Sequence, residues 1–302
     1  MSIDKNICTV LINYNSDIDT VKCLKTLQES TLVPKVILID NASKTPIDQA
    51  KIDFYPDIHL IHNAENVGFG RANNIGIEWA MKNTQADYFF ILNNDTLVEK
   101  NTNEVLIKNF SVDPQIGMTT CLIEFVEPKS EIWYGGGEWD NRKGRPKVIR
   151  TKPLANQSRY VSFVSGCAMM IKREVIEKVG AFDKRFFMYI EDVEYCKRII
   201  DAGFKLYYTT ETKIVHVVNG SSSNNAAKGL NPKNPNLAFQ AYHKFKNTLL
   251  TMGMHLPTKD FLKFRIYYSF FTAYKVLQFT LAGRFDALKA IRKAYVDYGK
   301  EK

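Results

Sequence analysis

The chain has 302 residues, of which 45% are hydrophobic and 24% are charged. These proportions are those of an ordinary globular protein and exclude disordered and fibrous classes. The length suits one large α/β domain with an appendage, or two modest domains. Five scattered cysteines without a C-x-x-C spacing indicate neither a disulfide framework nor a zinc site, so we expect buried free thiols.

The net charge of +9 is concentrated near the C-terminus. From Leu237 to Lys302 there are 12 Lys and Arg against 4 Asp and Glu, an excess of eight positive charges. Such a local excess indicates a local anionic partner. The N-terminus has no basic signal region, and no uninterrupted apolar run reaches the roughly 18 residues of a membrane span, so we expect a cytoplasmic protein.

The first 220 residues alternate short β-rich runs with helical patterns, which predicts an α/β sheet flanked by helices. Strands are predicted at Ile7–Asn13, Lys35–Asp40, Ile58–Ile61, Asp87–Leu92, Val161–Val164, Ala168–Ile171 and Lys213–Val218. Helices are predicted after the first strand, around Ala72–Trp79, and from Asp192 to Ala202, where Gly203 is a natural cap.

The stretch Asn219–Asn236 is rich in Ser, Asn, Gly and Pro and predicts a loop or lid. After it the pattern is helical, and Phe261–Ala282 is an aromatic run interrupted by basic residues, which favours an amphipathic helix. We therefore divide the chain into a catalytic domain at 1–236 and a helical region at 237–302.

Polar clusters follow three of the predicted strands. They are Asn13–Asn15, Asp40–Ser43 and Asn93–Asp95. Ligands of open α/β sheets bind beyond the carboxyl ends of the strands, so these clusters predict a binding site there. A carboxylate at Asp95, flanked by carboxamides, is suited to Mg²⁺ or Mn²⁺ shared with substrate phosphates. The alternative is an Asx turn without a ligand.

Three further positions have a chemical and a structural interpretation. Asp192 follows an apolar run at a helix start, where it is either a general base or an N-cap. His216 in a strand is either a metal ligand or a structural histidine. Arg71 begins a helix after Gly68-Phe69-Gly70, where it is well placed to face an anion. The third glycine of a dinucleotide fingerprint is replaced by Asn73, which disfavours a Rossmann oxidoreductase.

In combination and in order, these motifs resemble the family 2 inverting glycosyltransferases, which have the GT-A fold. The resemblance covers roughly Ile7 to Ser222. Asn93–Asp95 is similar to the family's metal-binding D-x-D element, Ser165-Gly166 to its glycine loop, Glu191-Asp192 to its x-E-D element, and His216 to its C-terminal histidine. The implied fold is a mixed sheet flanked by helices, with a C-terminal helical extension.

The resemblance implies a nucleotide-sugar donor site. Asp40 would hydrogen-bond the pyrimidine base and Tyr14 would lie against it. Asp95 and His216 would bind Mg²⁺ or Mn²⁺ on the diphosphate. The other residues implied in binding the nucleotide sugar are Asn13, Gly70, Arg71, Asn93 and Asn94.

The resemblance also implies an acceptor side. Asp192 would be the general base of a single displacement with inversion, and Glu191 would position the acceptor. Gly166 would let the backbone approach the sugar. Trp133 and Tyr134 would form a stacking face for an acceptor sugar, with core packing as the alternative.

The sequence departs from the family pattern at Asn93, which occupies the first D-x-D position and leaves Asp95 as the sole carboxylate. This variant and the Tyr134-Gly135-Gly136 stretch are similar to rhamnosyltransferases. We expect dTDP-rhamnose as donor and a saccharide or lipid-linked saccharide acceptor, in cell-surface polysaccharide synthesis. A UDP-hexose or UDP-HexNAc donor is the alternative within the fold, and a non-catalytic nucleotide-sugar- or carbohydrate-binding protein is the alternative outside it.

The basic, aromatic C-terminal region suits the anionic inner face of a membrane, where the enzyme would bind peripherally and meet a lipid-linked acceptor. The alternatives are a homodimer interface or packing on the catalytic domain. Nucleic-acid binding is not expected, because the aromatic residues are not arrayed for base stacking.

Overall fold

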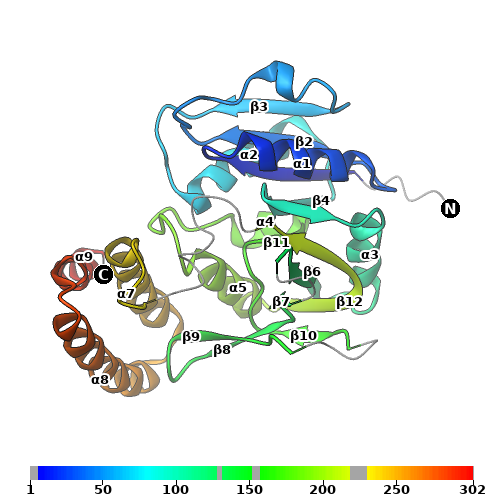
Figure 1. Ribbon diagram of the computed structural model, residues 1–302. Helices are drawn as coiled ribbons and strands as arrows, with labels where there is room; N and C mark the ends of the chain where they lie inside the picture. Colours follow the sequence, from blue (N-terminus) through cyan, green and yellow to red (C-terminus); the bar gives the residue numbers. More distant parts are fainter. Residues whose placement is uncertain (1–5, 128–130, 152–156, 218–229, 302) are drawn as a thin grey trace.

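The computed structural model describes residues 6–127, 131–151, 157–217 and 230–301. Its centre is a ten-stranded mixed sheet with the main order β10-β12-β6-β11-β4-β1-β2-β3. Helices cover this sheet, and three long C-terminal helices gather beside one end of it (Figure 1).

The N-terminal half of the sheet is parallel. It contains β1 (Ile7–Asn13), β2 (Lys35–Asp40), β3 (Ile58–His62) and β4 (Tyr88–Asn93), with β1 paired to both β2 and β4. The helices α1 (Asp17–Gln28) and α2 (Phe69–Asn83) connect these strands. The predictions for β1 and β2 are confirmed residue for residue, because both are apolar, β-branched runs buried on two faces, as parallel strands are.

The other half of the sheet is mixed. β11 (Ala168–Lys172) runs antiparallel to β4 and to β6 (Ile116–Phe125), and β12 (Lys205–His216) runs parallel to β6. Shorter strands complete it, and a separate hairpin is formed by β8 and β9. Their bounds are β5 Thr96–Val98, β7 Ile132–Tyr134, β8 Gly137–Asp140, β9 Arg145–Val148 and β10 Arg159–Val161.

The strands predicted at Ile58–Ile61, Asp87–Leu92 and Ala168–Ile171 differ from β3, β4 and β11 by one residue at one or both ends, and two other predictions differ by more. The strand predicted at Val161–Val164 is β10, which ends at Val161. β12 begins at Lys205 rather than Lys213, and Val218 lies outside the described residues. Most of the predicted loop Asn219–Asn236 also lies outside them. The sequence analysis missed β6 altogether, because Gly117 and two threonines interrupt its apolar run.

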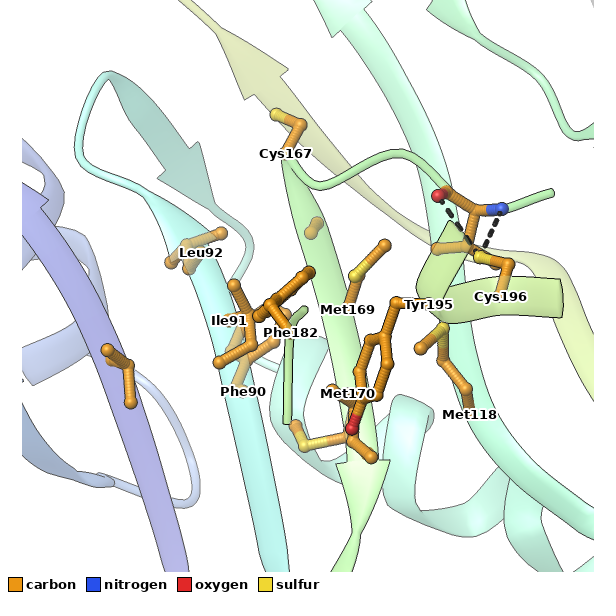
Figure 2. Packing of buried hydrophobic residues seen from close by; sticks show 14 of the residues in the cluster. Phe90, Ile91, Leu92, Met118, Cys167, Met169, Met170, Phe182, Tyr195 and Cys196 are labelled. Carbon is orange, nitrogen blue, oxygen red and sulfur yellow. Dashed lines mark hydrogen bonds between the residues drawn. The ribbon is translucent and has the colours of Figure 1, made fainter. Parts of the chain in front are cut away.

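Side chains from α5 (Glu191–Asp201) close the core over this half of the sheet, beside α4 (Arg173–Val179). The rings of Tyr195 and Phe182 have centroids 4.7 Å apart. Figure 2 shows Tyr195 together with Met169 and Met170 of β11. All five cysteines are buried and free, as predicted.

The C-terminal helices are α7 (Leu237–His255), α8 (Thr258–Leu281) and α9 (Phe285–Lys300), while α3 (Thr102–Lys108) lies across the sheet from them (Figure 1). α7 packs against α5 and α9 and is largely buried. Within the described part of the chain, no helix is long and apolar enough to cross a membrane.

α8 differs from the amphipathic helix expected from the sequence, because it is apolar on two opposite faces. Phe264, Tyr268 and Phe279 are buried on the inner face. The outer face exposes Leu262, Ile266, Phe270, Leu277 and Leu281, each by 58% or more. An exposed apolar face of this kind is typical of a surface that contacts a partner or a membrane.

Candidate functional site

A pocket of about 390 Å³ lies at the carboxyl ends of β1 and β4, and we call it the strand-end pocket. Three of the predicted polar residues at these ends, Asn93, Asn94 and Asp95, line it together with Tyr14. The opposite wall consists of Phe187, Met188 and Tyr189 before α5, and of Asn236, Phe239 and Gln240 at the start of α7.

Asn13 and Asp40 form a buried hydrogen-bond network beside this pocket. The Asn13 amide donates to Asp40 Oδ2 at 2.8 Å, and the backbone N–H groups of Ser43 and Ile47 donate to the same carboxylate. Burial alone would raise the pKa of Asp40, but these hydrogen bonds outweigh it and hold the pKa below its ordinary value. Asp40 is therefore a fixed anion.

A second hollow, of about 410 Å³, opens next to Asp40 and is lined by Ser43, His62 and Asn63 among others. Asn41 connects it to the strand-end pocket. The side-chain oxygen of Asn41 accepts a 2.9 Å hydrogen bond from the amide of Asn63. The side-chain amide of Asn41 donates a second one, also of 2.9 Å, to the side-chain oxygen of Asn66, which lines the strand-end pocket. Hydrogen bonds through Asn41 therefore link the walls of the two cavities, which share no lining residue.

Asp95 and His216 meet at the edge of the strand-end pocket although 121 residues separate them. His216 Nε2 lies 3.0 Å from Asp95 Oδ1. The pairing of β12 with β5, in which His216 lies opposite Thr96, produces this contact. The indole of Trp133 packs edge-on against the imidazole at 4.9 Å between ring centroids, so Trp133 fixes His216 and does not line the pocket.

The donor set at Asp95 and His216 fits a divalent cation shared with substrate phosphates. His216 is buried with Nδ1 unpartnered, and Asp95 offers carboxylate oxygens to the pocket. Among the described residues no cluster of three or more His, Cys, Asp or Glu could hold a metal without help. One or two protein ligands completed by phosphate oxygens are the usual arrangement for Mg²⁺.

Asp192 lies in the first turn of α5 and reaches back to the glycine loop. Its Oδ2 accepts from the Gly166 N–H at 3.1 Å. A Cβ at Gly166 would approach the Phe69 ring to 3.1 Å, so glycine allows the loop to lie between Phe69 and Asp192. Asp192 is not among the residues that line the strand-end pocket, but Phe69 is, which puts the carboxylate behind the pocket wall.

Glu191 and Asp192 have raised pKa values. Burial raises the pKa of Asp192 to about 6, against the effect of hydrogen bonds from Gly166 and Val193. Burial, and then the negative charge of Asp192, raise the pKa of Glu191 well above its ordinary value. Buried acids whose pKa values are shifted in this way are typical of functional sites.

The two residues before α5 have strained backbones. Tyr189 and Ile190 have φ of +66° and +73°, and for a β-branched residue such as Ile190 this conformation is an outlier. Asn247 of α7 stabilises this strained segment, because its side-chain amide donates to the backbone carbonyls of Met188 and Tyr189 at 3.0 and 2.7 Å. Strain maintained in this way is characteristic of functional sites.

Two predicted residues lie away from the pocket. A Cβ at Gly70 would meet Phe182 at 3.1 Å, so this position serves the packing of α2. Arg71 donates from Nε to the carbonyl of Lys184 at 2.7 Å. Neither residue lines the strand-end pocket.

Sequence reasoning missed the wall opposite the strand ends. Phe187, Met188 and Tyr189 belong to the apolar run that precedes Asp192, and Phe239 and Gln240 were assigned to the C-terminal region. The only signal for the former was their position directly before the two acids. No local pattern indicated that α7 returns to the sheet.

Comparisons with known proteins agree with this geometry. The family model described as "Glycosyl transferase family 2" matches residues 8–180. The chain is 25% identical over 235 residues to the N-acetylglucosaminyl-diphospho-decaprenol L-rhamnosyltransferase of Mycobacterium tuberculosis, which covers 68% of this chain and 74% of that protein. It is 23% identical over 257 residues to the dTDP-rhamnosyl transferase RfbF of Shigella flexneri, with 84% and 83% covered.

Solved structures show the same fold. The mannosyltransferase PcManGT of Pyrobaculum calidifontis, in complex with GDP-Man and Mn²⁺, is 14% identical with a TM-score of 0.56 and covers 98% of this chain and 88% of its own. GalNAc-T7, with UDP, GalNAc and Mn²⁺, is 20% identical with a TM-score of 0.55, and the match covers 70% of this chain and 44% of that one. The predicted GT-A fold, a mixed sheet flanked by helices with a C-terminal helical extension, is confirmed. Because the family model spans more than half of the chain, this protein belongs to glycosyl transferase family 2 and is a glycosyltransferase.

Proposed function

We propose that this protein transfers rhamnose from dTDP-rhamnose, with a divalent metal, to a hydroxyl of a saccharide or lipid-linked saccharide. The observation that carries the proposal is the contact of Asp95 with His216 at the edge of the strand-end pocket. The similarity to two rhamnosyltransferases supports the choice of sugar.

The donor would extend from the hollow beside Asp40 to the strand-end pocket. The pyrimidine would lie near Asp40 and reach Tyr14 at the strand-end pocket, and Asn13 would keep the Asp40 carboxylate in place. The diphosphate would reach Asn93, Asn94 and Asp95. A cation held by Asp95 and His216 would neutralise the charge that develops on the departing dTDP.

The acceptor reaction would be a single displacement. Asp192 removes the proton from the attacking hydroxyl, the acceptor oxygen forms a bond to the anomeric carbon, and the bond from that carbon to the dTDP oxygen breaks. Attack from the face opposite the leaving group inverts the anomeric configuration. The Gly166 N–H donates to the Asp192 carboxylate and orients it, and Glu191 would position the acceptor.

The apolar wall of the strand-end pocket favours a deoxy sugar. Phe187, Met188 and Phe239 face the strand ends across the pocket. Rhamnose carries a methyl group where a hexose carries a hydroxymethyl group, and an apolar wall binds the methyl without leaving a hydroxyl unpaired. This feature supports dTDP-rhamnose over a UDP-hexose.

A donor comparison tests the proposal. Transfer to a saccharide acceptor is measured with dTDP-rhamnose, UDP-glucose and UDP-N-acetylglucosamine, each with Mg²⁺, with Mn²⁺ and with EDTA. We expect turnover with dTDP-rhamnose and a divalent metal. Turnover with a UDP-sugar and none with dTDP-rhamnose would show that the donor assignment is wrong. Full activity in EDTA would show that the reaction needs no divalent metal.

The outer face of α8 supports peripheral membrane binding. Leu262, Ile266 and Phe270 recur every four residues and form one stripe with Leu277 and Leu281. Lys259 and Lys263 lie at its N-terminal end, so the exposed apolar face carries basic side chains that suit an anionic bilayer. A second copy of the chain is the alternative partner, and its test is given below.

A further inference from the structure

We propose that a basic pocket between the β8–β9 hairpin, α7 and α8 binds the diphosphate of a lipid-diphosphate-linked acceptor. The pocket has a volume of about 360 Å³. The inference rests on the proposed function and adds the acceptor class and its binding residues.

Four basic side chains line this pocket, and none of the described residues that line it carries a carboxylate. Lys143 and Arg145 come from the hairpin, Lys244 from α7 and Lys275 from α8. None of the four forms an ion pair with an acid among the described residues. Lys244 instead donates to Gln240, and Lys275 donates to the carbonyl of Leu230 and to Gln278. Four convergent cations without acids form a site for a multiply charged anion.

A neighbouring basic pocket shows why this one is distinctive. That neighbour also contains Lys143, and it contains Lys263, but Asp260 pairs with Lys263 at 2.9 Å and Asp201 pairs with His255 at 2.6 Å. The positive charges of the neighbouring pocket are thus partly neutralised within the protein. Those of the basic pocket between the β8–β9 hairpin, α7 and α8 have no acidic partner among the described residues and can bind an anionic ligand.

The hairpin is held over the pocket by close packing. A Cβ at Gly144, which has φ of +59°, would lie 2.6 Å from the Phe264 ring of α8 and 2.9 Å from Thr248 of α7. Only glycine lets the turn lie this close to both helices. Lys143 and Arg145 flank this glycine and are therefore fixed at the pocket mouth.

The pocket adjoins the catalytic groups. Ile190, which directly precedes Glu191 and Asp192, lines it, while the preceding Tyr189 lines the strand-end pocket. The Lys244 ammonium lies 4.9 Å from the centre of the Tyr189 ring, so one thin wall separates the two cavities. A sugar attached to a diphosphate here lies next to the proposed general base.

The floor of the pocket and the helix above it suit a lipid. Tyr268 and Phe271 of α8 form an apolar lining below the cations. Phe270, the next residue along the helix, is 74% exposed and belongs to the outer apolar face. A prenyl chain attached to the bound diphosphate can therefore leave the pocket around α8 and continue into a bilayer.

Calorimetry with farnesyl diphosphate tests the site directly, with dTDP and Mg²⁺ in excess to occupy the donor pocket. We expect the double variant Lys143→Gln/Arg145→Gln and the single variant Lys275→Met each to weaken farnesyl diphosphate binding at least tenfold, while dTDP affinity stays within twofold. The matched control is Arg142→Gln/Lys147→Gln, which removes the same two charges from the same hairpin at positions that do not line the pocket. Farnesol, which lacks the diphosphate, should not bind.

Several results would overturn the proposal. Equal weakening by the control and the test variants would show a diffuse charge effect, and unchanged affinity in all variants would place the ligand elsewhere. Loss of binding to phosphatidylglycerol vesicles with farnesyl diphosphate affinity intact would assign these cations to membrane headgroups. The binding assay needs no turnover, so it remains informative if the protein fails to use dTDP-rhamnose. Conversely, the variants could transfer rhamnose with an unaltered KM for a lipid-diphosphate acceptor. That result would show that this pocket does not bind the acceptor, while the proposed function would still hold.

Discussion

The side-chain amide of Asn247 donates a 2.7 Å hydrogen bond to the carbonyl of Tyr189, 58 residues earlier in the chain. It donates a second one, of 3.0 Å, to Met188. Through these bonds a C-terminal helix restrains the strained segment that forms one wall of the strand-end pocket and leads into Glu191 and Asp192. α7 is thus part of the site's construction.

We expect Asn247→Leu to destabilise the protein and to weaken donor binding. Two buried carbonyls would lose their donor, at about 1–3 kcal/mol each, and the left-handed conformation of Tyr189 and Ile190 would lose its restraint. Thermal unfolding and donor calorimetry measure the two effects. Thr251→Val is the matched control, because this hydroxyl on the same helix is buried without a hydrogen-bond partner. Equal donor affinity in Asn247→Leu and its parent would show that the segment holds its shape without Asn247.

A second prediction concerns the general base. Asp192→Asn should fold, bind donor with unchanged affinity and lose about 10²- to 10⁴-fold in transfer rate, since an amide accepts no proton from the attacking hydroxyl. Single-turnover transfer and donor calorimetry on the same preparation separate the two properties. A rate within a few-fold of the parent would remove Asp192 from this role.

The pH profile provides an independent prediction. The base must be ionised to act, and burial raises the pKa of Asp192 to about 6. As the pH falls through this value the protonated fraction rises, so kcat/KM should be nearly constant above about pH 7, fall to about half at pH 6 and approach a tenfold loss per unit below about pH 5. An ordinary aspartate would instead keep its activity down to about pH 4. A profile that remains flat to pH 5 is incompatible with this assignment.

The sequence predicted the donor half of the molecule better than the acceptor half, for physical reasons. β1 and β2 are continuous buried apolar runs, and the polar residues after them, Asn13 and Asp40, could therefore be placed at the sheet edge in advance. The family resemblance paired Asp95 with His216 across 121 residues, and the contact is present.

What sequence reasoning could not provide depends on tertiary contacts. The periodicity of α7 predicts a helix, but nothing in it indicates that Phe239 and Gln240 return to the strand-end pocket. The same holds for Lys244 and Lys275, which look like ordinary surface charges until the hairpin at Gly144 packs beside them. The predicted stacking face for an acceptor sugar divides in the structure. Tyr134 is fully buried, whereas Trp133 is half-buried with its indole edge-on to His216, so its role toward an acceptor stays a prediction.

Metal-supported donor binding should depend on Asp95. Asp95→Asn keeps the shape of the side chain but removes the negative charge that a divalent cation requires, so the gain in dTDP affinity on adding Mn²⁺ should disappear. Calorimetry with dTDP in Mn²⁺ and in EDTA measures this gain. Asp53→Asn, at an exposed carboxylate outside the pocket, is the control. If Asp95→Asn retains the full metal effect, the cation is bound elsewhere.

The outer face of α8 should hold the protein on anionic membranes. Replacing Ile266 and Phe270 by Asp removes two side chains that are 63% and 74% exposed. Burial of each in the interface contributes about 1.5 kcal/mol or more, so the double variant should bind phosphatidylglycerol vesicles roughly 100-fold more weakly. Val33→Asp/Val112→Asp, at exposed sites outside the C-terminal helices, should bind as the parent does.

The salt dependence of vesicle binding distinguishes its electrostatic contribution from its apolar contribution. The mass of the protein in solution shows whether the outer face of α8 binds a second copy of the chain instead of a bilayer. Lys and Arg near an anionic surface contribute about 1 kcal/mol each, and salt screens that contribution, whereas burial of apolar side chains is not screened. Vesicle binding by the parent should therefore weaken with added salt and level off above zero. A parent that ignores the vesicles at low salt and runs as a dimer, which Ile266→Asp/Phe270→Asp converts to a monomer, would instead assign the face to a second copy of the chain. The exposed stripe from Leu262 to Leu281 is too long to be left uncovered, and these two measurements decide between a bilayer and a partner subunit.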